Sequence, residues 1–202
     1  MINITIDDNL YEVPEKTTIL KAAKLNGIKI PTLCYNEKVR LYGGCRLCLV
    51  EVATAKAPDT FRLLPACCTN IEDGLVIKNS SERVKESRRY IIKLLLARSP
   101  DSEKLLKYAS DLDIPVKERD SLDIVGEYLL YRAKKHTDTK CILCGLCVRV
   151  CAEITERNAI NFSERGMKRK VKTPFDKISK TCIGCGACAY VCPTTAITVE
   201  EA

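Results

Sequence analysis

Two cysteine-rich stretches decide how this chain folds: CILCGLCVRVC at residues 141–151 and CIGCGACAYVC at residues 182–192. They match at seven of eleven positions and are offset by 41 residues, so they form an internal repeat. Each has the spacing C-x2-C-x2-C-x3-C, and Pro193 follows the second. A duplicated half-motif predicts a C-terminal unit with pseudo-two-fold symmetry.

This spacing is the one with which bacterial ferredoxins bind [4Fe–4S] clusters. Three cysteines at two-residue gaps allow one loop to surround three iron corners of a cube, and Gly145, Gly184 and Gly186 allow the backbone to approach the sulfides. The fourth cysteine falls on the following helix and points at the other cluster. Structural zinc does not require the third C-x2-C step, and a redox-active C-x-x-C pair does not account for eight cysteines. We therefore expect two [4Fe–4S] ligand sets: Cys141, Cys144, Cys147 and Cys192, and Cys151, Cys182, Cys185 and Cys188.

The N-terminal residues predict a small unit of strands and one helix. Isoleucines alternate with polar residues from position 2, as in a half-buried strand, and an Asp-Asp-Asn turn follows them. A threonine can then cap a helix that ends at a glycine. The expected elements are strands at 2–6, 10–13, 49–52 and 75–77 and a helix between Thr17 and Gly27, in a mixed α+β arrangement.

A second group of cysteines lies within this N-terminal unit. Their order is Cys34-x10-Cys45-x2-Cys48, followed after eighteen residues by Cys67-Cys68. The plant-type [2Fe–2S] pattern begins with a shorter gap, and a longer gap only enlarges the loop between ligands. Gly43 and Gly44 permit the tight path that such a loop needs. The spacing alone also fits four zinc ligands, so both metals stay open at this point.

The middle of the chain contains no cysteine from residue 69 to residue 140 and predicts helices. Val84, Ile91 and Leu95 fall on one helical face, with Ile92 and Leu96 beside them. We expect Ser99-Pro100 to cap and begin a second helix through Leu112, and a third helix at 121–131.

Cysteine usage indicates a reducing compartment. The chain has thirteen cysteines, an odd number that cannot all pair, and its N-terminus has acidic residues where a signal peptide would be basic and apolar. No apolar run approaches the roughly 20 residues that span a bilayer. We expect a cytoplasmic protein with reduced thiols and no membrane span.

The formal charge of +7 does not indicate nucleic-acid binding, because no basic stripe with interleaved aromatic residues occurs. Three oxidised clusters with their thiolates, at roughly −2 each, would bring the charge to about +1. The excess of basic residues is therefore interpreted as compensation for buried anionic cofactors.

Four stretches resemble one protein family. IPTLCYNEKVRLYGGCRLCLVEV (30–52) and LLPACCTNIEDG (63–74) are similar to a [2Fe–2S] domain shared by three groups of proteins. The groups are the large iron–sulfur subunit of complex I, the diaphorase iron–sulfur subunit of NAD-reducing hydrogenases, and the N-terminal region of [FeFe] hydrogenases. The similarity continues through SERVKESRRYIIKLLLARSP (81–100) and RGMKRKVKTPFDKISKTCIGCGACAYVCP (165–193), and it is weakest at 100–137.

The resemblance implies a β-grasp ferredoxin fold for the N-terminal unit and iron rather than zinc. The family's fourth ligand follows Pro-Ala, which selects Cys67 over Cys68. The implied [2Fe–2S] ligands are Cys34, Cys45, Cys48 and Cys67.

One departure from the family changes the cluster count. The family usually has an H-x3-C-x2-C-x5-C segment that binds a further [4Fe–4S] cluster. Residues 98–137 of this chain contain no cysteine and one histidine, His136. We expect His136 to be a surface residue, and no catalytic domain after Ala202. The expected domains are 1–79, a β-grasp [2Fe–2S] domain; 80–137, a helical linker without that cluster; and 138–202, a 2[4Fe–4S] ferredoxin domain.

The sequence contains no dinucleotide fingerprint, phosphate loop or nucleophile–base pair. We therefore expect a non-catalytic subunit that moves single electrons between a flavin-containing NAD(P)(H) subunit and another redox site. That site could be a hydrogenase, a formate dehydrogenase or a ferredoxin-linked transhydrogenase, and ferredoxin is a further candidate partner. A free ferredoxin-like carrier is the alternative, although such carriers are compact and strongly acidic. A zinc-dependent interaction module is a third hypothesis.

Overall fold

The computed structural model describes residues 1–114, 140–177 and 179–198. The chain forms two compact units, Met1–Tyr35 with Leu41–Ile91, and Asn36–Arg40 with Ile92–Ala202. The boundary falls inside one helix, and each unit is described by itself.

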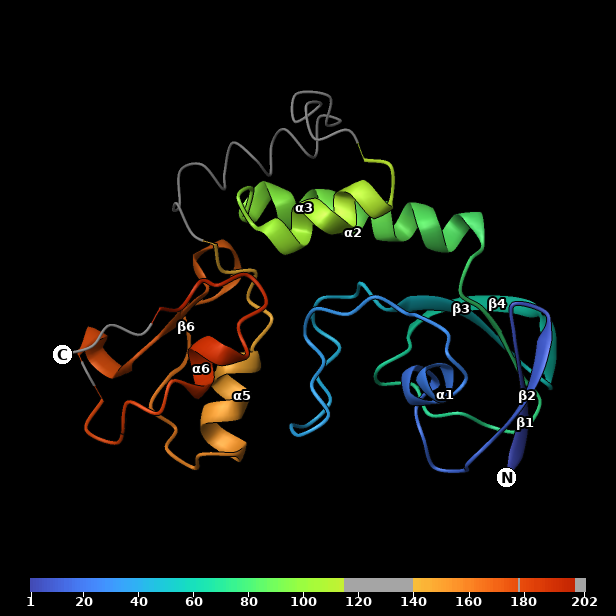
Figure 1. Cartoon of the computed structure of the whole chain (residues 1–202), viewed down its shortest axis with the longest axis horizontal. Helices are drawn as coiled ribbons and strands as arrows, with labels where there is room; N and C mark the ends of the chain where they lie inside the picture. Colours follow the sequence, from blue (N-terminus) through green and yellow to red (C-terminus); the bar gives the residue numbers. More distant parts are fainter. Residues whose placement is uncertain (115–139, 178, 199–202) are drawn as a thin grey trace. The chain divides into compact units, whose positions relative to one another are not determined.

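The N-terminal unit is built on a five-stranded sheet with the order β2-β1-β5-β3-β4 (Figure 1). β5 lies at the centre, parallel to β1 and antiparallel to β3, and the two outer pairs are antiparallel hairpins. The strands are β1 (Ile2–Ile6), β2 (Asn9–Val13), β3 (Leu49–Thr54), β4 (Ala57–Pro65) and β5 (Leu75–Lys78).

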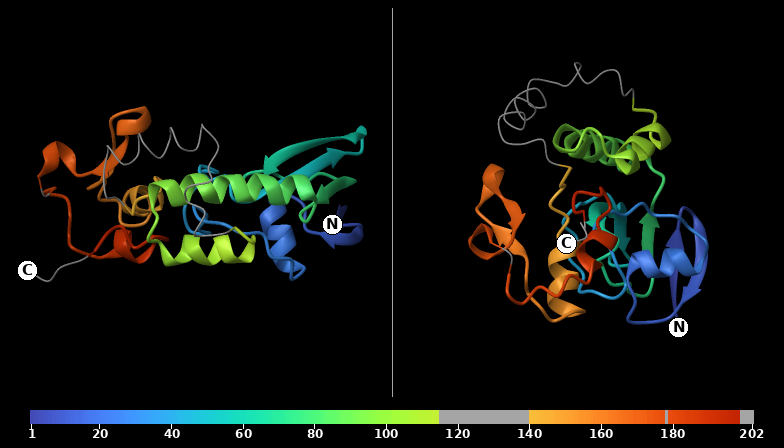
Figure 2. Two further views of the ribbon diagram at one scale, coloured as in Figure 1. Left: turned by 90° about the horizontal axis from the view of Figure 1, so that it is seen from above. Right: turned by 60° about the vertical axis from the view of Figure 1, so that its left-hand side comes forward.

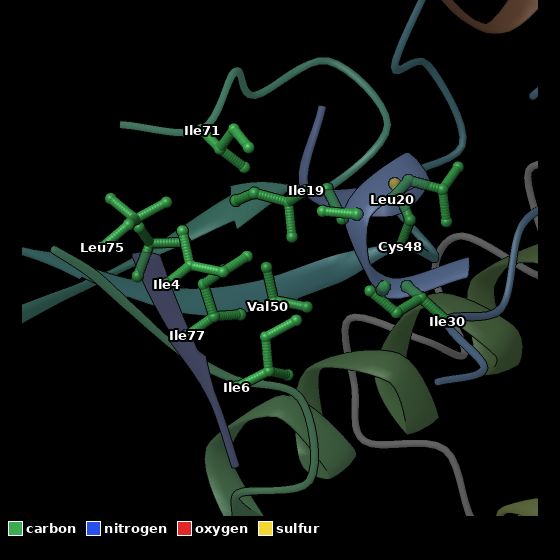
Figure 3. Packing of buried hydrophobic residues seen from close by; sticks show 14 of the residues in the cluster. Ile4, Ile6, Ile19, Leu20, Ile30, Cys48, Val50, Ile71, Leu75 and Ile77 are labelled. Carbon is green, nitrogen blue, oxygen red and sulfur yellow. The ribbon is translucent and has the colours of Figure 1, made fainter. Parts of the chain in front are cut away.

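The core of this unit lies between the sheet and α1 (Ile19–Leu25). Ile4 and Ile6 of β1 and Ile77 of β5 are fully buried there, and Figure 3 shows them facing the side chains of α1. The alternation of isoleucines from residue 2 therefore predicted the buried face of β1 correctly.

Two N-terminal details differ from the sequence-based expectation. The cap of α1 is Thr18, whose hydroxyl accepts a hydrogen bond from the Lys21 amide, and not Thr17. Thr17 is instead bound through its carbonyl to the Ile71 amide. β4 was not predicted, because most of its residues are exposed and its sequence gives no alternating pattern.

The helical prediction for the middle stretch is confirmed for two helices, α2 (Glu82–Arg98) and α3 (Glu103–Asp111) (Figure 2). The buried face of α2 is formed by Val84, Arg88 and Ile92, whereas the predicted Ile91 and Leu95 are only half-buried. The stripe was misplaced because an arginine occupies its central position.

The expected start of α3 was also wrong. The Ser99 amide donates to the Leu95 carbonyl, so Ser99 still belongs to the end of α2. α3 has Ser102 as its N-cap residue.

The C-terminal unit contains short elements around its cysteine loops. β6 pairs with β7 in an antiparallel hairpin, with Phe162 opposite Val171. Residues 196–198 contain no strand. The elements are α5 (Leu146–Glu153), β6 (Asn161–Ser163), η1 (Gly166–Lys168), β7 (Lys170–Lys172), η2 (Pro174–Asp176) and α6 (Ala187–Tyr190).

The α+β prediction is confirmed, with a mixed sheet in the first unit and short helices and strands in the second. The expected third helix at 121–131, His136 and the domain boundary at 137 lie outside the described residues. In the part of the chain that the structure describes, none of the helices is long and apolar enough to cross a bilayer.

The central position of β5 predicts unequal effects for two neighbouring substitutions. Ile77→Ala removes a fully buried side chain and should lower the free energy of unfolding of this unit by about 2–5 kcal/mol. Val76→Ala, on the half-buried side of the same strand, should cause a clearly smaller loss. Hydrogen exchange of peptides from β1 and β3 in the full chain measures both. Equal losses would contradict the assigned core.

Candidate metal centres

The β3–β4 hairpin brings together two cysteines that are far apart in the sequence. Leu49 at the start of β3 lies opposite Pro65 at the end of β4. The pairing continues one step further, where the Ala66 amide donates to the Cys48 carbonyl at 3.0 Å. Cys48 and Cys67 therefore flank the same end of the hairpin, and both are buried.

The loop before β3 positions the other pair. The Cys45 amide donates to the Cys34 sulfur at 3.5 Å. Gly43 and Arg46, on either side of this contact, have positive φ angles of 62° and 61°, so the chain turns tightly around Cys45. Cys34 is buried and Cys45 is half-buried.

Hydrogen bonds and burial make these thiols unequal. A hydrogen bond from the Cys67 thiol lowers the pKa of Cys48 to about 7, against the effect of burial. The same hydrogen bond raises the pKa of Cys67, and burial and the nearby Cys48 charge add to that increase. The hydrogen bond with Cys34, followed by burial, likewise raises the pKa of Cys45. Several thiolates can coexist here only beside positive charge, such as iron, because they repel one another.

The two adjacent cysteines differ in their surroundings. Cys67 is 2% exposed, whereas Cys68 is half-buried. Their sulfurs are 3.4 Å apart. A Cβ atom on Gly43 would stand only 2.8 Å from the Cys68 sulfur, so glycine at this position allows the loop to approach that side chain. The thiol of Cys67 forms the hydrogen bond that lowers the pKa of Cys48, so Cys67 is grouped with the buried cysteines Cys34 and Cys48.

The two cysteine repeats of the C-terminal unit have the same local backbone conformation. Leu143 and Gly184, which are equivalent in the repeat, have φ angles of 56° and 67°. Gly145 and Gly186 have φ angles of 71° and 69° and precede α5 and α6. Two residues with left-handed backbone conformation lie between the cysteines of each loop and make it curl. Three of these four residues are glycine, the residue that adopts this conformation most easily.

The thiol interactions cross between the repeats. Burial raises the pKa of Cys147 to about 12, with further contributions from the charges of Cys144, Cys141 and Cys192. Burial also raises the pKa of Cys188, with contributions from Cys185 and Cys151. The last cysteine of each repeat therefore acts on the third cysteine of the other.

Backbone amides also point at the last cysteine of each repeat. The Ala159 amide donates to the Cys151 sulfur at 3.3 Å, and the Ala196 amide donates to the Cys192 sulfur at 3.2 Å. Such N–H groups stabilise a thiolate. Cys182 and Cys185 are exposed, so the second loop is the less covered of the two.

A cavity of about 720 Å³ lies within the C-terminal unit. It is lined by cysteines of both repeats: Cys141, Cys144, Cys147, Cys188 and Cys192. A cavity walled by thiols fits a group held by sulfur ligands.

Basic residues line the same cavity, and sequence analysis did not assign them to a site. Arg98, at the end of α2, donates through Nε to the Cys141 carbonyl at 2.8 Å and through Nη2 to the Arg169 carbonyl at 3.3 Å. Lys168, Arg169, Lys170 and Lys172 contribute from η1 and the β6–β7 hairpin. The basic run of residues 165–172 was the available signal. These charges agree with the expected compensation of an anionic cofactor.

The donor sets fit iron–sulfur clusters better than a single ion. Over residues 1–114, 140–177 and 179–198, no three cysteine, histidine or acidic side chains converge on one metal-ion position. An iron–sulfur core spreads its four cysteines over several irons and does not require that convergence. A purely cysteine donor set with neighbouring N–H groups and cations is suited to it.

Two family models match the chain. The model described as "2Fe-2S iron-sulfur cluster binding domain" matches residues 1–82. The model described as "4Fe-4S dicluster domain" matches residues 140–196.

Curated relatives match nearly the whole chain. An NADH-quinone oxidoreductase subunit of Rhizobium meliloti is 32% identical over 98% of this chain and 24% of its own length. The alpha subunit of the NADPH-Fe(3+) oxidoreductase of Geobacter sulfurreducens is 35% identical over 96% of this chain and 24% of its own. The HndD subunit of the NADP-reducing hydrogenase of Solidesulfovibrio fructosivorans is 32% identical over 100% and 36%. The chain thus spans only about a quarter to a third of these relatives.

A solved structure has the same fold. A chain of the NAD+-reducing [NiFe]-hydrogenase in the H2-reduced state superposes with a TM-score of 0.75 at 25% identity, over 96% of this chain and 86% of that one. The predicted resemblance is confirmed by sequence and by structure. This chain thus carries a 2Fe-2S iron–sulfur cluster binding domain followed by a 4Fe-4S dicluster domain.

Proposed function

We propose that this protein is an electron-transfer subunit that relays single electrons between a flavin-containing NAD(P)(H) subunit and another redox site. The observation that carries the proposal is that cysteines of the two C-terminal repeats interact with one another, within a chain that matches two ferredoxin-type domains. When bound, iron–sulfur clusters accept and release electrons one at a time.

The proposed cofactors are one [2Fe–2S] cluster and two [4Fe–4S] clusters. The hydrogen bonds that link Cys48 to Cys67 and Cys34 to Cys45 support the first ligand set. The crossed charge interactions of Cys147 and Cys188 support the other two. The proposed sets are Cys34, Cys45, Cys48 and Cys67; Cys141, Cys144, Cys147 and Cys192; and Cys151, Cys182, Cys185 and Cys188.

The chain's own residues have three tasks in this function. Burial of Cys34, Cys48 and Cys67 excludes water from one group, and Arg98 holds the loop of Cys141 in place. The basic residues of the C-terminal cavity offset negative charge there. The left-handed residues between the cysteines shape each loop.

The partners are inferred from the relatives. Their names refer to NADH-quinone, NADPH-Fe(3+) and NADP-reducing hydrogenase activities, and each is a subunit of a larger enzyme. A nicotinamide exchanges two electrons at once, whereas a cluster exchanges one. A flavin subunit that can do both is therefore the proposed partner between them. A hydrogenase, a formate dehydrogenase or a ferredoxin is the proposed partner at the other end. Reduced thiols favour the cytoplasm.

Metal content tests the proposed cofactors. Anaerobically purified protein should contain about 10 iron atoms per chain, from 2 + 4 + 4. Inductively coupled plasma mass spectrometry measures iron and zinc together. Stoichiometric zinc with little iron would refute the proposal, and about 14 iron atoms would reveal a further [4Fe–4S] cluster.

The adjacent cysteines test the first ligand set. Cys67→Ala should abolish the [2Fe–2S] signal in electron paramagnetic resonance, because it removes the buried thiol that is bound to Cys48. Cys68→Ala is the matched control and should leave the signal nearly unchanged. Loss of the signal in Cys68→Ala alone would reverse the assignment.

Native purification distinguishes a subunit from a free carrier. Tyr90 is 50% exposed on α2, whereas Leu94 of α2 and Tyr108 of α3 are half-buried. A flavin-containing subunit should co-purify in stoichiometric amount, and the isolated chain should oxidise or reduce NAD(P)(H) only when that subunit is added. A native monomer that shuttles electrons between unrelated enzymes would favour the carrier.

A further inference from the structure

Arg88 is a buried cation in the middle of α2. It is 7% exposed, and the hydrogen bonds of its guanidinium within residues 1–114, 140–177 and 179–198 go to neutral oxygens. Nη1 donates to the Asn79 carbonyl at 3.2 Å, and Nη2 donates to Asn79 Oδ1 at 2.7 Å and to the Leu49 carbonyl at 2.9 Å. Its Nε is buried without a hydrogen-bond partner among the described residues.

This positive charge has no paired carboxylate in the described part of the chain. The carboxylate of Asp7, which acts on Arg88 electrostatically, instead accepts hydrogen bonds from the amides of Asn79 and Ser80. Burying an unpaired charge is costly, and burial accordingly lowers the pKa of Arg88 to about 10. Arg88 still remains protonated at neutral pH. A buried, charged arginine needs a counter-charge nearby.

The position of the guanidinium indicates where that counter-charge lies. The Leu49 carbonyl belongs to the residue directly after Cys48, and neighbouring Cα atoms are about 3.8 Å apart. The negative charge of Cys48 acts on Arg88 more strongly than that of Asp7, and both oppose the effect of burial on its pKa.

We propose that Arg88 is a positioning residue that provides the counter-charge of the [2Fe–2S] site and raises its reduction potential. This inference rests on the proposed ligand set that includes Cys48. One-electron reduction adds one negative charge to the site while Arg88 keeps its proton. A fixed cation beside Cys48 stabilises that added charge.

A purely structural role would predict a different result. Arg88 also ties α2 to the first residue of β3 and to Asn79, so its loss can destabilise the unit. Arg89 provides a matched control, since it is adjacent in the same helix but pairs with Glu82 at 2.9 Å on the exposed side. Removing Arg89 changes the net charge equally and leaves the buried contacts in place.

The experiment is a redox titration of the full, cluster-loaded chain, with the [2Fe–2S] and [4Fe–4S] signals followed separately by electron paramagnetic resonance. At the potential that half-reduces the parent [2Fe–2S] site, Arg88→Met should raise its oxidised-to-reduced ratio about tenfold, a shift of about 59 mV to lower potential. Arg88→Lys keeps the charge and should stay within about threefold of the parent. Arg89→Met should change little, and the [4Fe–4S] potentials should not change.

The outcomes separate the two proposals. A parent chain without a [2Fe–2S] signal refutes the ligand set itself. A normal signal with an unchanged potential in Arg88→Met, or an equal shift in Arg89→Met, overturns the role of Arg88 alone. If Arg88→Met does not accumulate with its cluster, Arg88→Lys decides. A parent-like potential supports the charge role, and a tenfold lower ratio of reduced to oxidised protein contradicts it.

Discussion

The repulsion between thiolates governs much of this structure. Burial raises the pKa of Cys147, and the charges of nearby cysteines raise it further; a hydrogen bond with Cys48, burial and the Cys48 charge raise the pKa of Cys67. Positive charges and backbone N–H donors near the cysteines offset this effect, because both stabilise a thiolate. Arg88 lies beside the first group, and basic residues of η1 and the β6–β7 hairpin line the C-terminal cavity. Five basic residues thus line a cavity that is walled by cysteines: Arg98, Lys168, Arg169, Lys170 and Lys172.

What could be predicted from sequence was mainly local. The spacing and the glycines of each repeat predicted loops around the cysteines; Gly145, Gly184 and Gly186 adopt left-handed conformations in these loops, and so does Leu143, which was not predicted. Alternation predicted the buried face of β1, and glycine marked the end of α1. These signals work because the interactions that cause them are formed by neighbouring residues.

Non-local pairing was harder to predict. β4 is largely exposed and has no alternating pattern, and its place follows from pairing with β3. That pairing is nevertheless the reason why Cys67 lies beside Cys48. The burial of Arg88 could not be predicted for a related reason. Its charged side chain is held at a core position by the carbonyls of Leu49 and Asn79, which lie on other segments of the chain.

The central place of β5 has a consequence for synthesis on the ribosome. The β1–β2 and β3–β4 hairpins touch no common strand until Leu75–Lys78 has emerged, because β5 joins them. Cys34, Cys45, Cys48 and Cys67 all leave the ribosome before that strand. At about 5–20 residues per second the nascent chain therefore holds these thiols in an open sheet for seconds. The sheet that carries these cysteines is therefore completed only after β5 has been translated.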